Sequence, residues 1–346
     1  MKQTLSDSID DYLTHSESKG LSKSTMHGKR VTLRRFLTVT GNILTENVHE
    51  GHVDQFFNEI TKTRSARSRQ LDTSILRGFF NWAARTRRTG RHQNPMADRQ
   101  APKAAPRAWR GFDVSKVPAL LDSASHPRDR ILLALGCYLL GRSVEFQLLT
   151  VGDVRLDAGY VSYRIPKTFK TDELPITQEL DEELRRWLTY YSQECGSLDP
   201  NWYLVPAKTP PRMEAVGGPV KGAGELRPTR KAIEMHKIAQ GALVSIGFPI
   251  RDPDGKPLNE GMHTIRRSIA RALHDQLRDE GDPSPVETVR SVLNHATERE
   301  TRRYIGLETS RVHRDARLKG RLMFPGLRAE NVSDLDSARR NREERA

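Results

Sequence analysis

The feature that most constrains the fold is a stretch rich in arginine, lysine, alanine, glycine and proline between residues 86 and 110. Its prolines at positions 95, 102 and 106 disfavour regular secondary structure. A chain of 346 residues is also long for a single hydrophobic core. We therefore predict two domains, residues 1–88 and 112–328, joined by an extended basic linker over residues 89–111. This composition is consistent with a linker that lies along a phosphate backbone, and equally with one that only connects the two domains.

Residues 1–88 carry apolar side chains at helical spacing in four short runs. The runs are Leu5, Ile9, Tyr12 and Leu13; Leu33, Phe36 and Leu37; Val53, Phe56, Phe57 and Ile60; and Ile75, Phe79, Phe80, Trp82 and Ala83. Four short helices with brief connectors predict a small helical bundle. The surplus of basic over acidic residues between Lys62 and Arg77 favours a surface that faces DNA, with a merely solvated face as the alternative.

Residues 112–328 mix helical and strand patterns. Strands joined by a polar turn are predicted from the alternating residues 160–164, the turn PKTFKTD and residues 174–176. The fold class is therefore mostly α with a small antiparallel β-sheet. Helices are predicted over residues 114–123, 128–140, 179–191, 229–246, 262–277 and 286–294, and a loop over residues 208–228. Residues 329–346 form a charged C-terminal tail, which is either frayed or docked in a neighbour's groove through Val332 and Leu335.

The charge balance of the chain indicates a polyanionic partner. Lysine and arginine number 57 and aspartate and glutamate 44, so the formal net charge is +13. A globular protein this basic usually binds nucleic acid, or less often an anionic membrane surface, and the alternative is a charge that serves solubility. The excess leans towards arginine, which favours phosphate recognition.

The apolar and cysteine content indicates the compartment. Cys137 and Cys195 form neither a disulfide framework nor a metal-ligand spacing. The N-terminus lacks an apolar signal core, and the longest apolar run, residues 131–140, is too short to span a bilayer. We expect a cytoplasmic, nucleoid-associated protein without a membrane partner.

Several motifs carry residue types suited to phosphate chemistry, yet each has an ordinary structural interpretation when taken alone. Arg142 and Glu145 are three residues apart and would form a surface ion pair on a helix. Lys167 would be a solvated turn lysine. A basic helix would account for His263 and Arg266, a helix cap for His295, and an amphipathic core for Tyr304.

Taken together in chain order, these residues resemble the tyrosine recombinase family of phage and mobile-element integrases. The first arginine motif of the family matches Gly141-Arg142-Ser143-Val144-Glu145, followed by Leu148–Val154. The β-hairpin lysine matches Lys167, and the H-x-x-R box matches His263-Thr264-Ile265-Arg266. The L-G-H box, with its tyrosine nine residues later, matches Leu293-Asn294-His295 and Tyr304. Asn294 stands where glycine is usual, and Thr264 stands where the family often has an acidic or small residue. The resemblance covers roughly residues 5 to 325.

The resemblance implies a four-helix, SAM-like core-binding domain and a mixed α/β catalytic domain that together form a C-shaped clamp on duplex DNA. It also implies a homotetramer on two recombination sites, strand exchange through a Holliday junction and, for direction, accessory factors. Because the chain begins almost directly with the bundle, we expect no separate arm-binding domain.

The resemblance also implies catalytic roles. Tyr304 would be the nucleophile that forms a 3′-phosphotyrosine, with Arg142 and Arg266 on the phosphate. His263 would accept the phenolic proton, Lys167 would protonate the leaving 5′ oxygen, and His295 would hydrogen-bond the phosphate. Glu145 would orient Arg142 or a histidine. The sequence offers no carboxylate cluster for a metal, so we expect no metal ion. A phosphotyrosine would keep the energy of the broken phosphodiester, so we expect no ATP or other cofactor.

Other classes of protein remain as alternatives. A type IB topoisomerase uses similar chemistry and differs in site specificity and strand exchange, and a telomere resolvase would normally be a longer chain. A DNA-binding regulator with an inactive recombinase-like domain would be expected to lose one of the catalytic residues, and none is lost here. A metal-dependent nuclease would need the carboxylate cluster that this sequence lacks.

Overall fold

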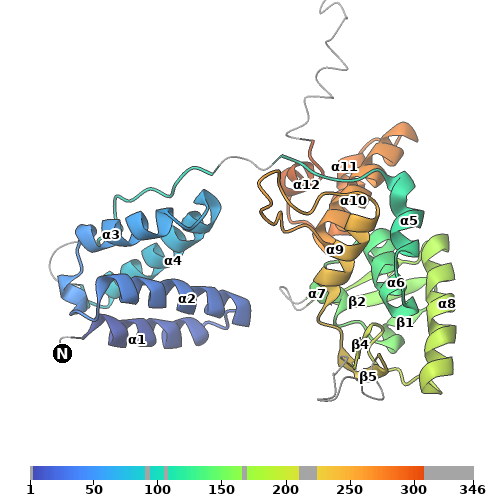
Figure 1. Ribbon diagram of the computed structural model, residues 1–346, viewed down its shortest axis with the longest axis horizontal. Coiled ribbons are helices and arrows are strands. Elements are labelled where there is room, and N and C mark those ends of the chain that lie inside the picture. The colour runs from blue at the N-terminus through green and yellow to red at the C-terminus, as the bar shows by residue number, and fades with distance from the viewer. Residues whose placement is uncertain (1–2, 90–93, 105–107, 166–169, 210–223, 308–346) are drawn as a thin grey trace, which may run out of the picture. The chain divides into compact units, whose positions relative to one another are not determined.

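The computed structural model describes residues 3–89, 94–104, 108–165, 170–209 and 224–307, which form two compact units, Met1–Arg107 and Ala108–Ala346 (Figure 1). The boundary between the units falls inside the Pro- and Arg-rich segment. Met96 from this segment is fully buried in the core of the first unit, whereas Trp109 packs within the second. The two ends of the segment are therefore fastened to different units.

The first unit consists of four helices, as the apolar spacing predicted. They are α1 (Leu5–Glu17), α2 (Lys23–Thr40), α3 (Glu50–Thr61) and α4 (Ala66–Arg85), with a 3₁₀ turn η1 (Thr45–Asn47) between α2 and α3. Hydroxyl side chains cap three of the helices, namely Thr4 on α1, Ser22 on α2 and Ser65 on α4. Each hydroxyl accepts a hydrogen bond from a backbone amide in the first turn, which fixes where the helix begins.

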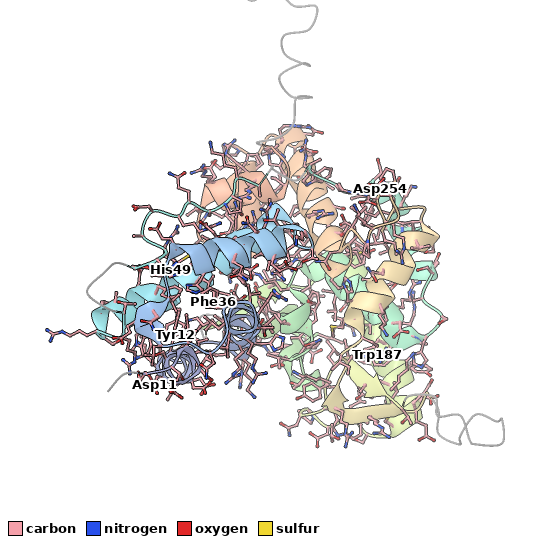
Figure 2. The ribbon with its side chains drawn as sticks, turned by 60° about the vertical axis from the view of Figure 1, so that its left-hand side comes forward. Asp11, Tyr12, Phe36, His49, Trp187 and Asp254 are labelled. Carbon is pink, nitrogen blue, oxygen red and sulfur yellow. The ribbon has the colours of Figure 1, made fainter. Side chains whose placement is uncertain are left out.

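The core of this unit is aromatic. Phe36 contacts Phe56 and Phe80 edge-to-face, with ring centroids 5.4 and 5.7 Å apart, and Tyr12 contacts Phe79 in the same manner at 5.5 Å. Figure 2 labels Tyr12 and Phe36 in this unit. Because these rings come from all four helices, they tie the bundle together. One buried carboxylate, Asp72, is balanced by an ion pair with Arg64 and by a hydrogen bond from Thr32.

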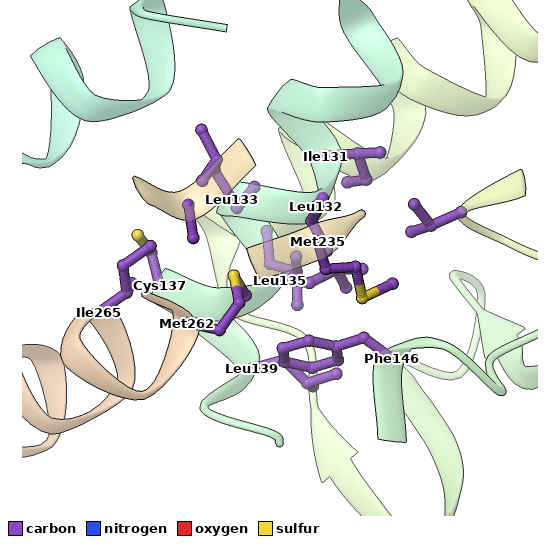
Figure 3. Packing of buried hydrophobic residues seen from close by; sticks show 14 of the residues in the cluster. Ile131, Leu132, Leu133, Leu135, Cys137, Leu139, Phe146, Met235, Met262 and Ile265 are labelled. Carbon is purple, nitrogen blue, oxygen red and sulfur yellow. The ribbon is translucent and has the colours of Figure 1, made fainter. Parts of the chain in front are cut away.

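The second unit is built around an apolar helix at its centre. Helix α6 (Pro127–Ala134) continues into a π-helical turn, η3 (Leu135–Leu139), where an uninterrupted helix was predicted. Figure 3 shows side chains of this segment packed with Phe146, Met235 and Met262. The other helices are α5 (Val117–Asp122), α7 (Ser143–Phe146), α8 (Gln178–Cys195), α9 (Met235–Ser245), α10 (Met262–Asp279), α11 (Pro285–Leu293) and α12 (Glu298–Tyr304), with 3₁₀ turns η2 (Val114–Lys116) and η4 (Val151–Asp153).

The predicted small antiparallel sheet is confirmed. Strands β1 (Val154–Arg155), β2 (Tyr160–Ile165) and β3 (Lys170–Pro175) pair in the order β1-β2-β3. In the register of β2 and β3, Tyr163 lies opposite Asp172. Strand β2 alternates between exposed and buried residues because one face of the sheet covers the core.

A second, two-stranded sheet corrects the prediction for residues 208–246. Strand β4 (Pro206–Lys208) pairs with β5 (Leu226–Lys231) where a loop and the start of a helix were predicted, and α9 begins only at Met235. Pro228 suggested a loop because proline cannot donate to a ladder. It is tolerated because β5 pairs with β4 alone, and its carbonyl accepts a hydrogen bond from the Tyr203 amide. Residues 210–223 and the tail 329–346 lie outside the described residues.

Both cysteines are free thiols. Cys137 is buried in η3, and burial raises its pKa to about 12, whereas Cys195 at the end of α8 is partly exposed. In the described ranges, no helix combines the length and apolar character that crossing a membrane would require.

Candidate active site

Helix α10 supplies two of the predicted site residues from its first turns. Thr264 fixes the start of the helix, because its hydroxyl accepts from the Gly261 amide and donates to buried Glu260 at 2.6 Å. The threonine at this position therefore serves the helix N-terminus. His263 and Arg266, one turn apart, project from this fixed start, His263 towards solvent and Arg266 into the interior.

Arg266 is a buried cation without a carboxylate partner among the described residues. Its side chain is only 2% exposed, and one guanidinium nitrogen donates to the Leu293 carbonyl at 2.6 Å. Its Nε atom is buried and has no hydrogen-bond partner in this part of the chain. Burial lowers the pKa of the guanidinium from its usual value. A buried guanidinium with spare donors is suited to an anion.

The turn after α11 positions His295. Asn294 has a left-handed backbone with φ of 54°, a conformation that glycine and asparagine adopt most readily. This explains physically why asparagine can replace glycine here. The imidazole of His295 is buried, and its Nδ1 hydrogen-bonds the Thr301 hydroxyl at 3.1 Å. Burial, aided by nearby Arg266 and Arg142, lowers the pKa of His295 to about 4, so the ring is neutral at pH 7.

Tyr304 is the last residue of the short helix α12. Its ring meets the His295 ring edge-to-face at 5.2 Å, and the Arg266 guanidinium carbon lies 5.7 Å from the ring centre. The phenol donates a hydrogen bond to the backbone carbonyl of His263 at 3.3 Å. Desolvation raises the pKa of the phenol, and the positive charges of Arg266, Arg267 and Arg142 oppose that rise.

Arg142 lies close enough for its charge to act on His263, His295 and Tyr304. The chain leaves η3 through Leu140, which has a left-handed φ of 55°, and Arg142 then caps α7. Glu145 is 3% exposed and binds Arg142 twice, through the backbone amide at 2.6 Å and the guanidinium at 2.9 Å. The predicted Arg142–Glu145 pair is therefore a partly buried clamp, not a surface ion pair.

The β2–β3 hairpin is tied to the His295 turn. Asp172 of β3 accepts hydrogen bonds from the Asn294 amide at 2.9 Å and the Tyr163 hydroxyl at 3.0 Å. Lys167 lies outside the described residues, between the two strands. The contact joins the hairpin that bears the predicted lysine to the turn that bears the predicted histidine.

The structure thus gathers five of the six predicted catalytic residues around one spot, namely Arg142, His263, Arg266, His295 and Tyr304. Burial and the charges of Arg266 and Arg142 also lower the pKa of His263. Thr301 and Asp172 support this cluster, and no sequence motif marks either residue. The arrangement offers two guanidinium groups, two neutral imidazoles and a phenol, which suits binding and attack on a phosphodiester. In the ranges described, no group of three His, Cys, Asp or Glu residues could hold a metal ion.

Comparison with known proteins points in the same direction. Residues 9–87 match the family described as phage integrase, N-terminal SAM-like domain. The tyrosine recombinase XerA of Thermococcus kodakarensis is 29% identical over 192 residues, which are 55% of this chain. The chain matches only 64% of the length of that relative.

Solved structures agree on the fold. A lambda integrase dimer bound to a COC′ core site is 16% identical, with a TM-score of 0.63 over 88% of this chain and 77% of that one. A XerH recombinase in a post-cleavage complex with a palindromic difH substrate is 16% identical, with a TM-score of 0.59 over 85% of this chain and 79% of that one. The resemblance stated from the motifs is therefore confirmed: the N-terminal unit has a phage-integrase SAM-like domain, and the chain has the fold of the tyrosine recombinases.

Proposed function

We propose that this protein is a tyrosine site-specific recombinase that cleaves and rejoins duplex DNA. The observation that carries the proposal is the position of Tyr304. Its ring lies beside the neutral His295 and beside buried Arg266, which pairs with no carboxylate in the described ranges. A phenol is a weak nucleophile at its ordinary pKa, so it needs both a base and a cationic site that binds the phosphate. Both lie within the same cluster.

In the proposed reaction, the Tyr304 oxygen attacks phosphorus in line while Arg142 and Arg266 bind the non-bridging oxygens. A bond forms between Tyr304 and the 3′ phosphate, and the bond from phosphorus to the 5′ oxygen breaks. His263 accepts the phenolic proton, for which its lowered pKa leaves it neutral at pH 7. Lys167 gives a proton to the departing 5′ oxygen.

His295 and Glu145 have supporting roles in this proposal. If the Thr301 hydroxyl donates to Nδ1 of His295, the ring carries its proton on Nε2 and can donate it to a phosphate oxygen. Glu145 holds the Arg142 guanidinium in place. The phosphotyrosine conserves the energy of the broken bond, so a 5′ hydroxyl from another strand can reverse the step without ATP or another cofactor.

The partners in this proposal are double-stranded recombination sites and three further copies of the chain. Both units would form a clamp around DNA, for which the net charge of +13 is favourable. A lambda integrase tetramer bound to a Holliday junction has the same fold, with a TM-score of 0.61 and 16% identity over 86% of this chain and 79% of that one. We infer a corresponding homotetramer, with strand exchange through a Holliday junction and accessory factors that set its direction.

The substitution Tyr304→Phe tests the proposal directly, because it removes the attacking oxygen and keeps the ring. Wild type and variant are incubated with labelled DNA that carries a nick near each candidate site, so that the cleaved end diffuses away and the intermediate accumulates. On a denaturing gel, a slow labelled band is expected with wild type and none with Tyr304→Phe. Both proteins should bind the DNA equally.

The matched control is Tyr160→Phe, which removes a hydroxyl from an exposed tyrosine of β2 and should keep the band. An adduct that persists in Tyr304→Phe would contradict the proposed role. Relaxation of supercoiled DNA without site preference or strand exchange would indicate a topoisomerase. Tight binding with no adduct over a wide panel of sites would favour a regulator with an inactive domain.

A further inference from the structure

The chain enters the second unit by packing a tryptophan against the turn that follows Tyr304. Gly306 lies two residues beyond Tyr304 and has a left-handed φ of 79°. A Cβ atom on Gly306 would lie 2.4 Å from Cγ of Trp109, which is closer than real Cβ atoms approach other groups. The indole of Trp109 therefore sits directly on the backbone of this turn.

Helix α10 completes the contact. The guanidinium carbon of Arg271 lies 6.0 Å from the Trp109 ring centre, and the same side chain donates to the Ile305 carbonyl at 3.2 Å. Ile305 is fully buried. Trp109, Arg271 and the turn after Tyr304 thus form one joint between the entering chain, α10 and α12.

The residues after Trp109 fasten the entering chain along α10. The Arg110 carbonyl accepts a hydrogen bond from the side chain of Arg267, and the Arg110 side chain bonds the Pro249 carbonyl at 2.9 Å. The Phe112 amide donates to the Ser268 hydroxyl at 3.1 Å. Trp109 is therefore held in place by the residues that directly follow it.

Helix α12 needs such support because it has only seven residues, Glu298–Tyr304. A helix this short is not stable by itself and depends on packing. Its C-terminal end is closed by bonds from the Gly306 amide to the Arg303 carbonyl at 3.3 Å and from the Leu307 amide to the Arg302 carbonyl at 2.8 Å. Trp109 covers the turn in which these bonds form.

We propose that Trp109 is a positioning residue for Tyr304: its indole packs on Gly306 and holds the end of α12, and with it the phenol, at the distance from the phosphate that attack requires. This inference rests on the recombinase function proposed above. The indole acts by its shape, since its Nε1 is buried and has no hydrogen-bond partner in the described part of the chain. Phenylalanine at position 109 should therefore keep most of this packing, and alanine should lose it.

The test compares Trp109→Ala, Trp109→Phe and a control, Trp202→Ala, in the full-length protein. Trp202 is also partly buried, but it packs against the large core of the second unit. Three quantities are measured: single-turnover cleavage of nicked DNA, affinity for the same DNA, and hydrogen–deuterium exchange of the amides in residues 298–307. Misplacement by about 1 Å can slow an enzyme roughly a hundredfold.

We expect Trp109→Ala to slow cleavage by about ten- to a hundredfold, to bind DNA as the wild type does, and to exchange faster at residues 303–307. Trp109→Phe should cleave within about threefold of the wild type, and Trp202→Ala should leave exchange at residues 303–307 unchanged. Normal cleavage by Trp109→Ala would overturn the proposal. So would slow cleavage with unaltered exchange at α12, or equal losses in Trp109→Ala and Trp202→Ala.

The exchange measurement separates this inference from the proposed function. If the wild type forms no adduct with any DNA, the recombinase proposal fails, while faster exchange at α12 in Trp109→Ala alone still supports the contact. A second measurement independent of activity is the melting temperature of Gly306→Ala in two backgrounds. The added methyl should lower it more in the wild type than in Trp109→Ala, and equal decreases would contradict the packing.

Discussion

The two arginines of the candidate site lie in contrasting surroundings. The side chain of Arg142 is 25% exposed, and its guanidinium is neutralised by Glu145 at 2.9 Å. Arg266 as a residue is only 2% exposed, and its guanidinium bonds a backbone carbonyl and pairs with no carboxylate among the residues described. Within the described residues, the charge of Arg142 is therefore balanced by a carboxylate and that of Arg266 is not.

This difference indicates that the two arginines have different tasks: Arg142 is held in a fixed orientation, and Arg266 offers a charge that attracts an anion. A bound carboxylate fixes Arg142 in one geometry at little cost to stability. Burying Arg266 without a counter-charge costs free energy, and this cost is offset only when an anion arrives. In the function proposed above, Arg266 is the group whose charge an incoming phosphate neutralises. Burial itself lowers the pKa of its guanidinium, because desolvation disfavours the charged form.

The strongest test of this contrast replaces each arginine with methionine and measures the free energy of unfolding by urea. Arg142→Met leaves the buried carboxylate of Glu145 without its guanidinium and should lose about 3 kcal/mol. Arg266→Met removes a desolvated charge and should be at least as stable as the wild type. Both variants should lose DNA cleavage. Arg142→Met should therefore lose both stability and activity, whereas Arg266→Met should lose activity alone.

The effect of sulfate on the melting temperature is a second test of the contrast between Arg142 and Arg266. It should raise the melting temperature of the wild type by binding at the unbalanced charge, and should raise that of Arg266→Met much less. If Arg266→Met unfolds more easily than Arg142→Met, the contrast drawn here is wrong.

A smaller effect on stability is expected from pH, because both arginines influence the pKa of His295. The pKa of His295 is lowered from 6.5 to about 4 in the folded protein, so between these values the unfolded chain binds the proton and the folded chain does not. Stability must therefore fall as pH drops through this window. The loss from His295 between pH 7 and pH 5 should be about 2 kcal/mol.

Urea unfolding at the two pH values, in the wild type and in His295→Gln, isolates this contribution from that of other groups. The variant should show a shallower decrease, and an equal decrease would remove His295 as the cause. Titration of His295 by NMR then compares the arginines. Its pKa should rise in Arg266→Met and, to a smaller extent, in Arg142→Met, following the order of their influence.

The smallest expected effect concerns the turn that supplies the acceptor of Arg266. Asn294→Ala keeps the left-handed backbone strained and loses the bond to Asp172, so it should lose about 1 kcal/mol of stability or slightly more. Asn294→Gly relieves the strain and should fall between alanine and the wild type, with cleavage slowed several-fold. Equal stability of the two variants would mean that backbone strain at residue 294 is unimportant.

The sequence predicted the fold class, and it named five residues that the structure brings together, because both depend on local pattern and fixed spacing. The four helices of the first unit follow directly from apolar periodicity. His263 and Arg266 are one helical turn apart, so the start of α10 brings both to the site. The roles of the individual site residues, and of Lys167 in particular, remain predictions.

What the sequence did not predict depends on contacts between distant segments. Strands β4 and β5 pair across residues 209–225, and nothing in their composition marks them. The support of His295 by Thr301, and of the hairpin by Asn294, becomes visible only once α11, α12 and β3 are placed together. The Trp109–Gly306 contact joins residues almost two hundred positions apart, and so leaves no periodic signal.

The difference between the two thiols has a practical consequence for following assembly. Cys137 is sealed in the core with a pKa near 12, so a maleimide dye will react with Cys195 at the end of α8 and leave Cys137 untouched. Because the whole chain has only these two cysteines, the natural protein can be labelled at one defined position without any substitution. Energy transfer between copies labelled in this manner would count the protomers that gather on a DNA site in real time.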